Sequence, residues 1–216
     1  MLTFDDLRED NWNQYGNFVM RSETIYPESI RSPGEEFTCI LKSEDSVAKV
    51  LLLDSEYIGN AVGFCMDEED KGDFGLDKLP GNPKIIYLFN ILIDPSHQGR
   101  GYGSMLMQEF IKSAKSKGYD YIVGHFRPNG SLHIIKKFGA VEGAVCKNWE
   151  NIGEDYIFCI LDLRSIPEAL PGEHVQDSRA CLPSLSIPPL KVSPAMGMPT
   201  YHQGHNFDMH HHAQTA

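Results

Sequence analysis

The sequence lacks any hydrophobic run that is long enough to cross a membrane. Its longest apolar stretch, residues 85–93, contains Asn90 and falls far short of the roughly 20 residues that a spanning helix needs. The opening segment, MLTFDDLRED, is acidic and has no long apolar part, so no secretory signal peptide is expected. We therefore expect a protein that does not have a membrane as its partner.

Cysteine is scarce, and its spacing follows no known motif. The chain has five cysteines, an odd number, and no two of them have the C-x-x-C spacing of a zinc or redox site. We therefore predict neither a disulfide framework nor a metal site, and we expect a reducing, cytoplasmic compartment. The cysteines are Cys39, Cys65, Cys146, Cys159 and Cys181.

Basic side chains are outnumbered by acidic ones. The chain has 19 Lys and Arg against 30 Asp and Glu, a net charge of −11. Such a chain lacks the electrostatic footprint of a protein that binds DNA, RNA or an anionic membrane, so these partners are not expected. The acidic excess serves solubility first, although six acids within residues 67–77 weakly favour a cationic substrate.

Proline and histidine divide the chain at about residue 164. Residues 165–216 hold seven of the 13 prolines and six of the nine histidines. Proline at this density prevents a long helix or a central strand, so a disordered tail is predicted. The triplet His210–His212 could bind a metal ion, but nothing near it supplies a fixed geometry, and an incidental solvated tail is favoured. Residues 1–164 are predicted to form the folded domain.

Hydrophobic periodicity within the predicted domain indicates alternating strands and helices. Asp10 and Ser32 are expected to be N-caps of the first two helices, with Pro33 at the first helical position of the second. The acidic segment 67–83 is predicted to be a solvated loop, which could form a lip over a site. The order of elements predicts an α/β (α+β) fold, in which helices flank a central mixed β-sheet. Helices are expected at 10–25, 33–42, 101–117 and 130–138, and strands before the first helix and at 46–53, 57–66, 85–93, 119–126, 140–147 and 154–163.

One glycine-rich segment, Gln98-Gly99-Arg100-Gly101-Tyr102-Gly103, joins a predicted strand to a predicted helix. Glycine lets the backbone approach a ligand closely, and the first N–H groups of a helix have no partner within the helix. Together they form a cradle for a phosphate or pyrophosphate, to which Arg100 adds a positive charge. The segment lacks the lysine of a P-loop, and Ser104 stands where a dinucleotide fingerprint has its third glycine. A glycine-rich turn without a ligand is the alternative interpretation.

With Gln98, Gly101 and Gly103 at the fixed positions, the segment resembles the Q/R-x-x-G-x-G/A motif of the GCN5-related N-acetyltransferase (GNAT) superfamily. The strand ILIDP before it, the helix GSMLMQEFIKSAKSKG after it and the later segment RPNGSLHIIKKFGA occur in the family's order. The resemblance therefore covers about residues 1–164. It implies a GNAT-like acyl-CoA N-acyltransferase fold and the use of acetyl-CoA as acyl donor.

The resemblance also implies which residues bind the cofactor. The preceding strand, at Leu92 and Ile93, would pair with the pantetheine arm, so it should diverge from the strand at 119–126 and leave its edge free. Asn129 occupies the place of a family asparagine that contacts the cofactor arm, and it is equally well placed to be a helix N-cap. The main-chain amides implied to hold the pyrophosphate are those of Gln98, Gly99, Arg100, Gly101, Tyr102, Gly103 and Ser104.

The implied reaction is direct transfer of an acetyl group to a primary amine of a small molecule or a protein. An amine substrate arrives mostly protonated, so some group must take a proton. Many relatives have a tyrosine general acid in the helix after the asparagine, but the matching position here is Ile135. The alternative is therefore an acyl-CoA-binding sensor or regulatory module that does not transfer efficiently.

Four residues are candidates for the remaining roles. Tyr87 and His125 are the candidate catalytic residues, because Tyr87 lies near a glutamate position of some relatives and the pKa of histidine suits proton transfer. Glu23 and Tyr26 end the first helical region, which often borders the acceptor site in the family, and they are candidate substrate-binding residues. The structural alternatives are a packed strand aromatic for Tyr87, a solvated or hydrogen-bonded histidine, and helix-end surface residues for the other two. The oligomeric state is not predicted.

Overall fold

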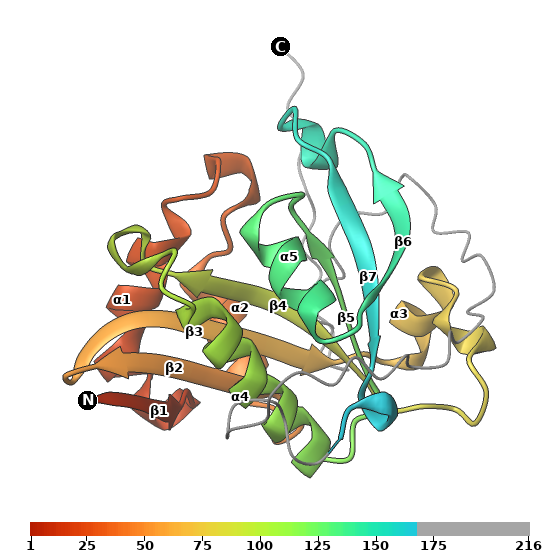
Figure 1. The fold of residues 1–216 in the computed structure, drawn as a ribbon, viewed down its shortest axis with the longest axis horizontal. Helices are drawn as coiled ribbons and strands as arrows, with labels where there is room; N and C mark the ends of the chain where they lie inside the picture. The colour runs from red at the N-terminus through yellow and green to blue at the C-terminus, as the bar shows by residue number, and fades with distance from the viewer. Residues whose placement is uncertain (168–216) are drawn as a thin grey trace, which may run out of the picture.

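Residues 1–167 are described by a computed structural model, in which helices flank a seven-stranded sheet of order β1-β2-β3-β4-β5-β7-β6 (Figure 1). The predicted mixed sheet is confirmed, and the predicted elements occur in the expected order, with one helix that was not predicted at Glu68–Asp73. None of the helices in this part of the chain has the length and apolarity that a membrane span requires.

The strands are β1 (Leu2–Asp6), β2 (Val47–Leu53), β3 (Glu56–Cys65), β4 (Ile85–Ile93), β5 (Tyr121–Phe126), β6 (Val141–Cys146) and β7 (Tyr156–Asp162). The α-helices are α1 (Trp12–Glu23), α2 (Gly34–Leu41), α3 (Glu68–Asp73), α4 (Tyr102–Ser116) and α5 (Gly130–Lys137). The predicted tail lies outside the described residues from residue 168 onward, and the His210–His212 triplet lies there too.

The sheet opens between β4 and β5. These two strands run parallel, whereas every other neighbouring pair is antiparallel. They pair only where Ile85–Tyr87 lies beside Tyr121–Val123, and beyond that point they diverge (Figure 1). The divergence that the sequence predicts is confirmed, and the second half of β4 has no strand on its β5 side among the described residues.

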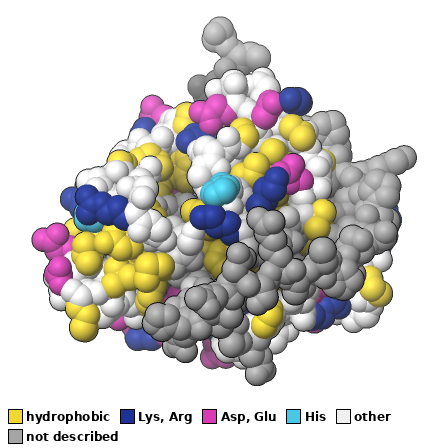
Figure 2. All heavy atoms as spheres, in the orientation of Figure 1, with side chains coloured by type: hydrophobic (Ala, Val, Ile, Leu, Met, Phe, Trp, Pro, Cys, Tyr) yellow, Lys and Arg dark blue, Asp and Glu magenta, His cyan; other side chains and the backbone are white. Residues whose placement is uncertain are grey.

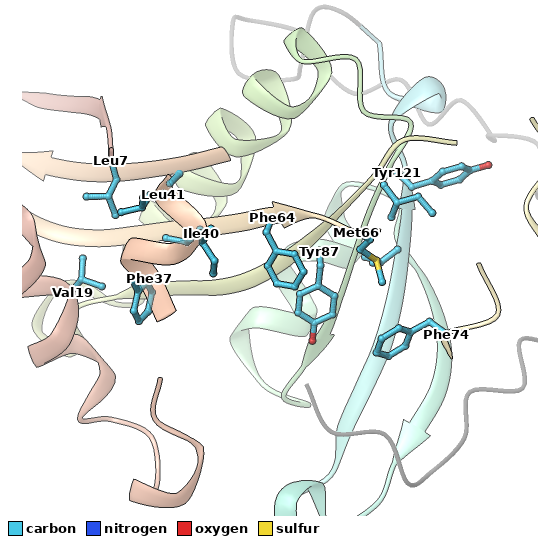
Figure 3. Packing of buried hydrophobic residues seen from close by; sticks show 14 of the residues in the cluster. Leu7, Val19, Phe37, Ile40, Leu41, Phe64, Met66, Phe74, Tyr87 and Tyr121 are labelled. Atoms are coloured by element: carbon cyan, nitrogen blue, oxygen red, sulfur yellow. The ribbon is translucent and has the colours of Figure 1, made fainter. Parts of the chain in front are cut away.

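Alternating side chains of β4 enter two hydrophobic cores, one on each face of the sheet. On the face that α1 and α2 cover, Tyr87 packs near Phe64 and Phe74 (Figure 3). On the other face, α4 packs against Ile86 and Leu88. The apolar stripe predicted for α4 is its buried face, formed by Leu106, Met107, Phe110, Ile111 and Ala114.

A β-bulge at Phe89 interrupts this alternation. Leu88 pairs with Gly63 and Asn90 pairs with Val62, so Phe89 is an extra residue in β4. An extra residue reverses which face each following side chain points to. Phe89 and Asn90 therefore both face α1 and α2, whereas strict alternation from Leu88 would place Asn90 in the apolar core under α4.

The acidic segment 67–83 is not a solvated loop, and that prediction is wrong. It contains α3 and a 3-10 turn at Leu76–Lys78. Phe74 and Leu76 are buried in the core on the α1 side, so two apolar side chains anchor the segment to the sheet. None of its residues lines the cavity described below, so it does not form a lip over that cavity.

Both predicted N-caps are also wrong. Asn11 precedes α1 and Pro33 precedes α2, and neither side chain caps its helix. Asp10 lies in the 3-10 turn before α1, and the Ser32 N–H donates to Glu23 Oε2 at 3.1 Å. The segment that leads into α2 therefore contacts the carboxylate of Glu23 at the end of α1.

Charged side chains of both signs are interspersed on the face of the molecule that Figure 2 shows. Lys and Arg occur there in small groups between acidic, polar and apolar side chains. Several basic side chains of the described chain pair with carboxylates, such as Lys84 with Asp45 at 2.6 Å and Arg127 with Glu154 at 2.9 Å. This arrangement contrasts with the basic stripe that is typical of nucleic-acid-binding proteins.

Gly59 in β3 lies against the end of β4, and we expect that a side chain there would displace the strand. A Cβ at this position would lie 2.5 Å from the Leu92 carbonyl oxygen and 2.6 Å from Ile93 Cδ1. Gly59→Ala should therefore lower the free energy of unfolding, measured in urea, by about 1–3 kcal/mol. Gly72→Ala is the matched control, because a Cβ at Gly72 would meet no atom within 4 Å. Equal losses in the two variants would contradict the role of this contact.

Candidate functional site

A cavity of about 550 Å³ lies where β4 and β5 diverge. Its walls come from β4, the turn before α4, the end of β5, α5, and the segments that follow α1 and precede β7. Of the site residues singled out from the sequence, Arg100 alone does not line the cavity, and it is exposed on the surface. The others that line it are Glu23, Tyr26, Tyr87, Leu92, Ile93, Gln98, Gly99, Gly101, Tyr102, Gly103, Ser104, His125 and Asn129.

The glycine-rich turn forms an open cradle of main-chain N–H groups at the start of α4. Gly99 and Gly101 have φ values of +74° and +85°, in the left-handed region that glycine adopts without strain. The helical hydrogen bonds begin with Ser104, whose N–H donates to the Gly101 carbonyl at 3.1 Å. Within residues 1–167, the N–H groups of residues 99–103 donate to no backbone carbonyl. Consecutive free donors at a helix N-terminus are suited to a pyrophosphate.

One contact holds this cradle close to the end of β4, and another brings α5 against it. Gln98 Nε2 donates to the Ile93 carbonyl at 2.9 Å. At Gly103, a Cβ would lie 2.6 Å from Ile134 Cδ1, so the absence of a side chain lets α5 pack against the first turn of α4. The cradle and the free edge of β4 therefore form one continuous wall of the cavity.

α5 supplies a polar N-terminus to the cavity but no tyrosine. Asn129 Oδ1 accepts from the Ser131 N–H at 3.0 Å, so the predicted N-cap is confirmed, while a cofactor contact of Asn129 stays a prediction. Ile135, at the expected tyrosine position, is buried in the core under α4 and does not line the cavity. Its neighbour Ile134 does line it.

Tyr87 and His125 lie side by side on β4 and β5. The Tyr87 hydroxyl and His125 Nδ1 are 2.8 Å apart, at hydrogen-bond distance. Burial raises the pKa of Tyr87 above its usual value and lowers the pKa of His125 to about 3. Both groups are therefore neutral at pH 7 and serve there as hydrogen-bonding groups.

Two ring nitrogens beside this pair have no partner among the described residues. His125 Nε2 and Trp149 Nε1 are buried without a hydrogen bond, and the two ring centroids are 4.4 Å apart. Buried polar atoms of this kind normally have a partner. Both side chains line the cavity, so they place polar atoms beside a largely aromatic wall.

Glu23 places a carboxylate, only 3% exposed, at the end of α1. Its Oε1 accepts from Asn90 Nδ2 at 2.6 Å, and its Oε2 accepts from the Ser32 N–H at 3.1 Å. Burial raises the pKa of Glu23 to about 7, against the lowering effect of these two hydrogen bonds. The alternative of a helix-end surface residue is thus wrong for Glu23, which is buried and hydrogen-bonded through both carboxylate oxygens.

Arg127 links the segment after α1 to the connection between β6 and β7. Its guanidinium lies 5.0 Å from the ring centroid of Tyr26 and 5.8 Å from that of Tyr156. Its Nε donates to the Tyr156 hydroxyl at 2.8 Å, and the guanidinium forms an ion pair with Glu154, with Nε 2.9 Å from Oε2. Arg127, Trp149 and Tyr156 were not predicted from the sequence. The position of Arg127 directly after a strand was the available signal, because ligands of α/β sheets bind beyond the carboxyl ends of strands.

Comparison with known proteins identifies similar sequences and folds. A sequence model of the acetyltransferase (GNAT) family matches residues 4–140, whereas no curated protein sequence matches significantly. The ribosomal-protein-S18-alanine N-acetyltransferase from Escherichia coli is 17% identical with a TM-score of 0.55, over 82% of this chain and 100% of that one. Arabidopsis thaliana NAA60 in complex with acetyl-CoA is 13% identical with a TM-score of 0.62, over 76% and 99%. A GNAT-family acetyltransferase from Streptococcus pneumoniae is 15% identical with a TM-score of 0.57, over 74% and 98%.

Proposed function

Because the chain belongs to the acetyltransferase (GNAT) family and therefore uses acetyl-CoA as its acetyl donor, we propose that it acetylates a primary amine by direct attack. The amine nitrogen forms a bond to the thioester carbon, the carbon–sulfur bond breaks, and coenzyme A leaves with the sulfur. The ammonium form of the amine must first lose a proton, which a group in the cavity must accept. A cytoplasmic location remains a prediction.

On the donor side, we expect the pyrophosphate at the main-chain amides of residues 98–104. The free N–H groups of residues 99–103 support this placement. We expect the pantetheine arm to pair with β4 at Leu92 and Ile93, where β4 has no strand beside it, and to pass Asn129. Arg100 is exposed and does not line the cavity, so its charge is not part of the proposed cradle.

On the acceptor side, we assign Glu23 as the general base. The observation that carries this proposal is its buried carboxylate on the cavity wall, with a pKa of about 7. A base with this pKa is half deprotonated at neutral pH and binds the transferred proton well, which is the best compromise for general-base catalysis. Tyr26 lies beside it under Arg127 and would contact the acceptor.

The acceptor itself is a primary amine of a peptide or a small molecule. The structurally similar enzyme from E. coli is named for acetylating an alanine of ribosomal protein S18, so a peptide amine is the first acceptor to test. The wall formed by Ile25, Ile30 and Trp149 is apolar, which favours an apolar side chain next to that amine.

The experiment measures coenzyme A release by the full chain with acetyl-CoA and a set of amines. The set contains a peptide with a free N-terminus, the same peptide with a blocked N-terminus and one lysine, and a polyamine. Saturable release with at least one amine, together with a product that has gained one acetyl group, is the expected result. Binding of acetyl-CoA without transfer to any amine would instead support the acyl-CoA sensor.

Tyr87 and His125 remain candidate catalytic residues, as neutral hydrogen-bonding groups on the cavity wall. We expect Tyr87→Phe to lower kcat by about 100-fold, the effect of losing one hydrogen-bond donor to the transition state. The pH at half-maximal kcat/KM should stay unchanged, because the pKa of Tyr87 is raised and that of His125 is about 3. Measuring the pH profiles of Tyr87→Phe and His125→Gln checks this; disappearance of the acid limb in His125→Gln would assign the base to His125 instead of Glu23.

A further inference from the structure

Asn90 is an amide in the middle of an apolar strand, and the bulge at Phe89 determines where it points. Because of that extra residue, Asn90 faces α1 and not the hydrophobic core under α4. Its side chain is buried, so both ends of its amide require partners. The bulge therefore brings Asn90 to Glu23 and to Asn60 of β3.

Four buried or half-buried side chains form one chain of hydrogen bonds that ends at the cavity. The Tyr57 hydroxyl donates to Asn60 Oδ1, and Asn60 Nδ2 donates to Asn90 Oδ1 at 2.7 Å. Asn90 Nδ2 then donates to Glu23 Oε1 at 2.6 Å. A carboxylate can only accept hydrogen bonds, so the charged form of Glu23 fixes the direction of every donor in this chain.

We infer that Asn90, backed by Asn60 and Tyr57, is a positioning residue that holds the Glu23 carboxylate at the cavity wall and stabilises its charged form. The inference rests on the proposed role of Glu23 as the base. It adds the residues that hold the carboxylate in place for that role. Successive hydrogen bonds with the same direction polarise one another, so the outer members strengthen the bond that Asn90 donates. Hydrogen bonds to a charged group are also stronger than those between neutral groups.

Other groups besides the hydrogen-bond chain also affect the pKa of Glu23. Glu36 of α2 raises the pKa of Glu23, and Arg31 lowers it, while burial is the largest cause of the rise. None of these effects passes through Asn90, so a change at Asn90 leaves them in place. The titratable groups facing Glu23 are Tyr26 in the segment after α1, Arg31 before α2, Glu36 of α2, Tyr57 of β3 and Tyr156 of β7.

The test compares the full chain with Asn90→Leu, which is similar in size and cannot donate. The midpoint of the Glu23 titration, followed by carboxyl carbon NMR and assigned with Glu23→Gln, should rise by about one to two pH units. The pH at half-maximal kcat/KM should rise equally, so that activity falls about 5- to 50-fold at pH 7 and recovers at high pH. Tyr121→Phe is the control, since it removes a hydroxyl that bonds Arg164 away from the cavity, and neither midpoint should move.

If the single variant does not fold, Asn60→Leu/Asn90→Leu replaces it, because removing both partners leaves no buried amide unpaired between them. A rise in the NMR midpoint without a rise in the kinetic midpoint would support the role of Asn90 and refute Glu23 as the base. An unchanged NMR midpoint would overturn the inference, whatever the rate does.

Discussion

Glu23→Gln is expected to lower kcat/KM for acetyl transfer by about 100- to 1000-fold. The glutamine keeps the size of the side chain and removes the carboxylate that we propose takes the proton from the ammonium. The affinity for acetyl-CoA should stay the same, because the cradle at residues 99–103 belongs to α4 and not to α1. Steady-state kinetics with the amine found in the coenzyme A release experiment, together with calorimetric titration of acetyl-CoA, measure both quantities.

The pH profile of the unmodified protein tests the same assignment. A base must be deprotonated to act, and the pKa of Glu23 is raised to about 7. The kcat/KM should therefore rise with pH and reach half its maximum near pH 7, and this limb should be absent in Glu23→Gln. Glu36→Gln is the control on the neighbouring helix, and it should retain the limb, moved to lower pH because Glu36 raises the pKa of Glu23. A Glu23→Gln variant with normal rates would contradict the proposed base.

Gly101→Val is expected to weaken acetyl-CoA binding by about 100-fold or more, equivalent to two hydrogen bonds to a charged group. Gly101 has a φ of +85°, a conformation that a β-branched residue adopts only under strain. Valine would rotate this peptide, so the N–H groups of the cradle would no longer converge. Calorimetric titration with acetyl-CoA measures the change in Kd.

Gly118→Val is the matched control for the cradle. Gly118 follows the other end of α4, has a φ of +75° and has open space around it, so valine imposes comparable backbone strain away from the cavity. This variant should bind acetyl-CoA normally. Normal binding by folded Gly101→Val would show that the pyrophosphate does not sit on this turn.

The sequence predicted the elements whose pattern is local. The apolar residues of α4 repeat with the helical period, and Gly99 and Gly101 indicate a turn by residue type alone. Both features depend on residues close together in the sequence, so they could be predicted from it. The segment 67–83 was mispredicted because its acidic side chains outweigh Phe74 and Leu76 in composition, although these two decide where it packs.

The acceptor side of the cavity was harder to predict than the donor side. Glu23, Asn60 and Asn90 come from three separate elements, and only the bulge at Phe89 brings Asn90 to the correct face. No sequence period marks a bulge in a continuous apolar strand. Arg127 and Trp149 were missed because their contacts join distant segments of the chain.

The two walls of the cavity belong to opposite faces of the sheet. The cradle belongs to α4, which covers one face, whereas Glu23 ends α1, which helps to cover the other. The free-energy effects of substitutions at well-separated positions are nearly additive. If the proposed function holds, substitutions within residues 24–33 should therefore change the choice of amine with little effect on acetyl-CoA binding, because the two sets of residues lie on opposite faces of the sheet.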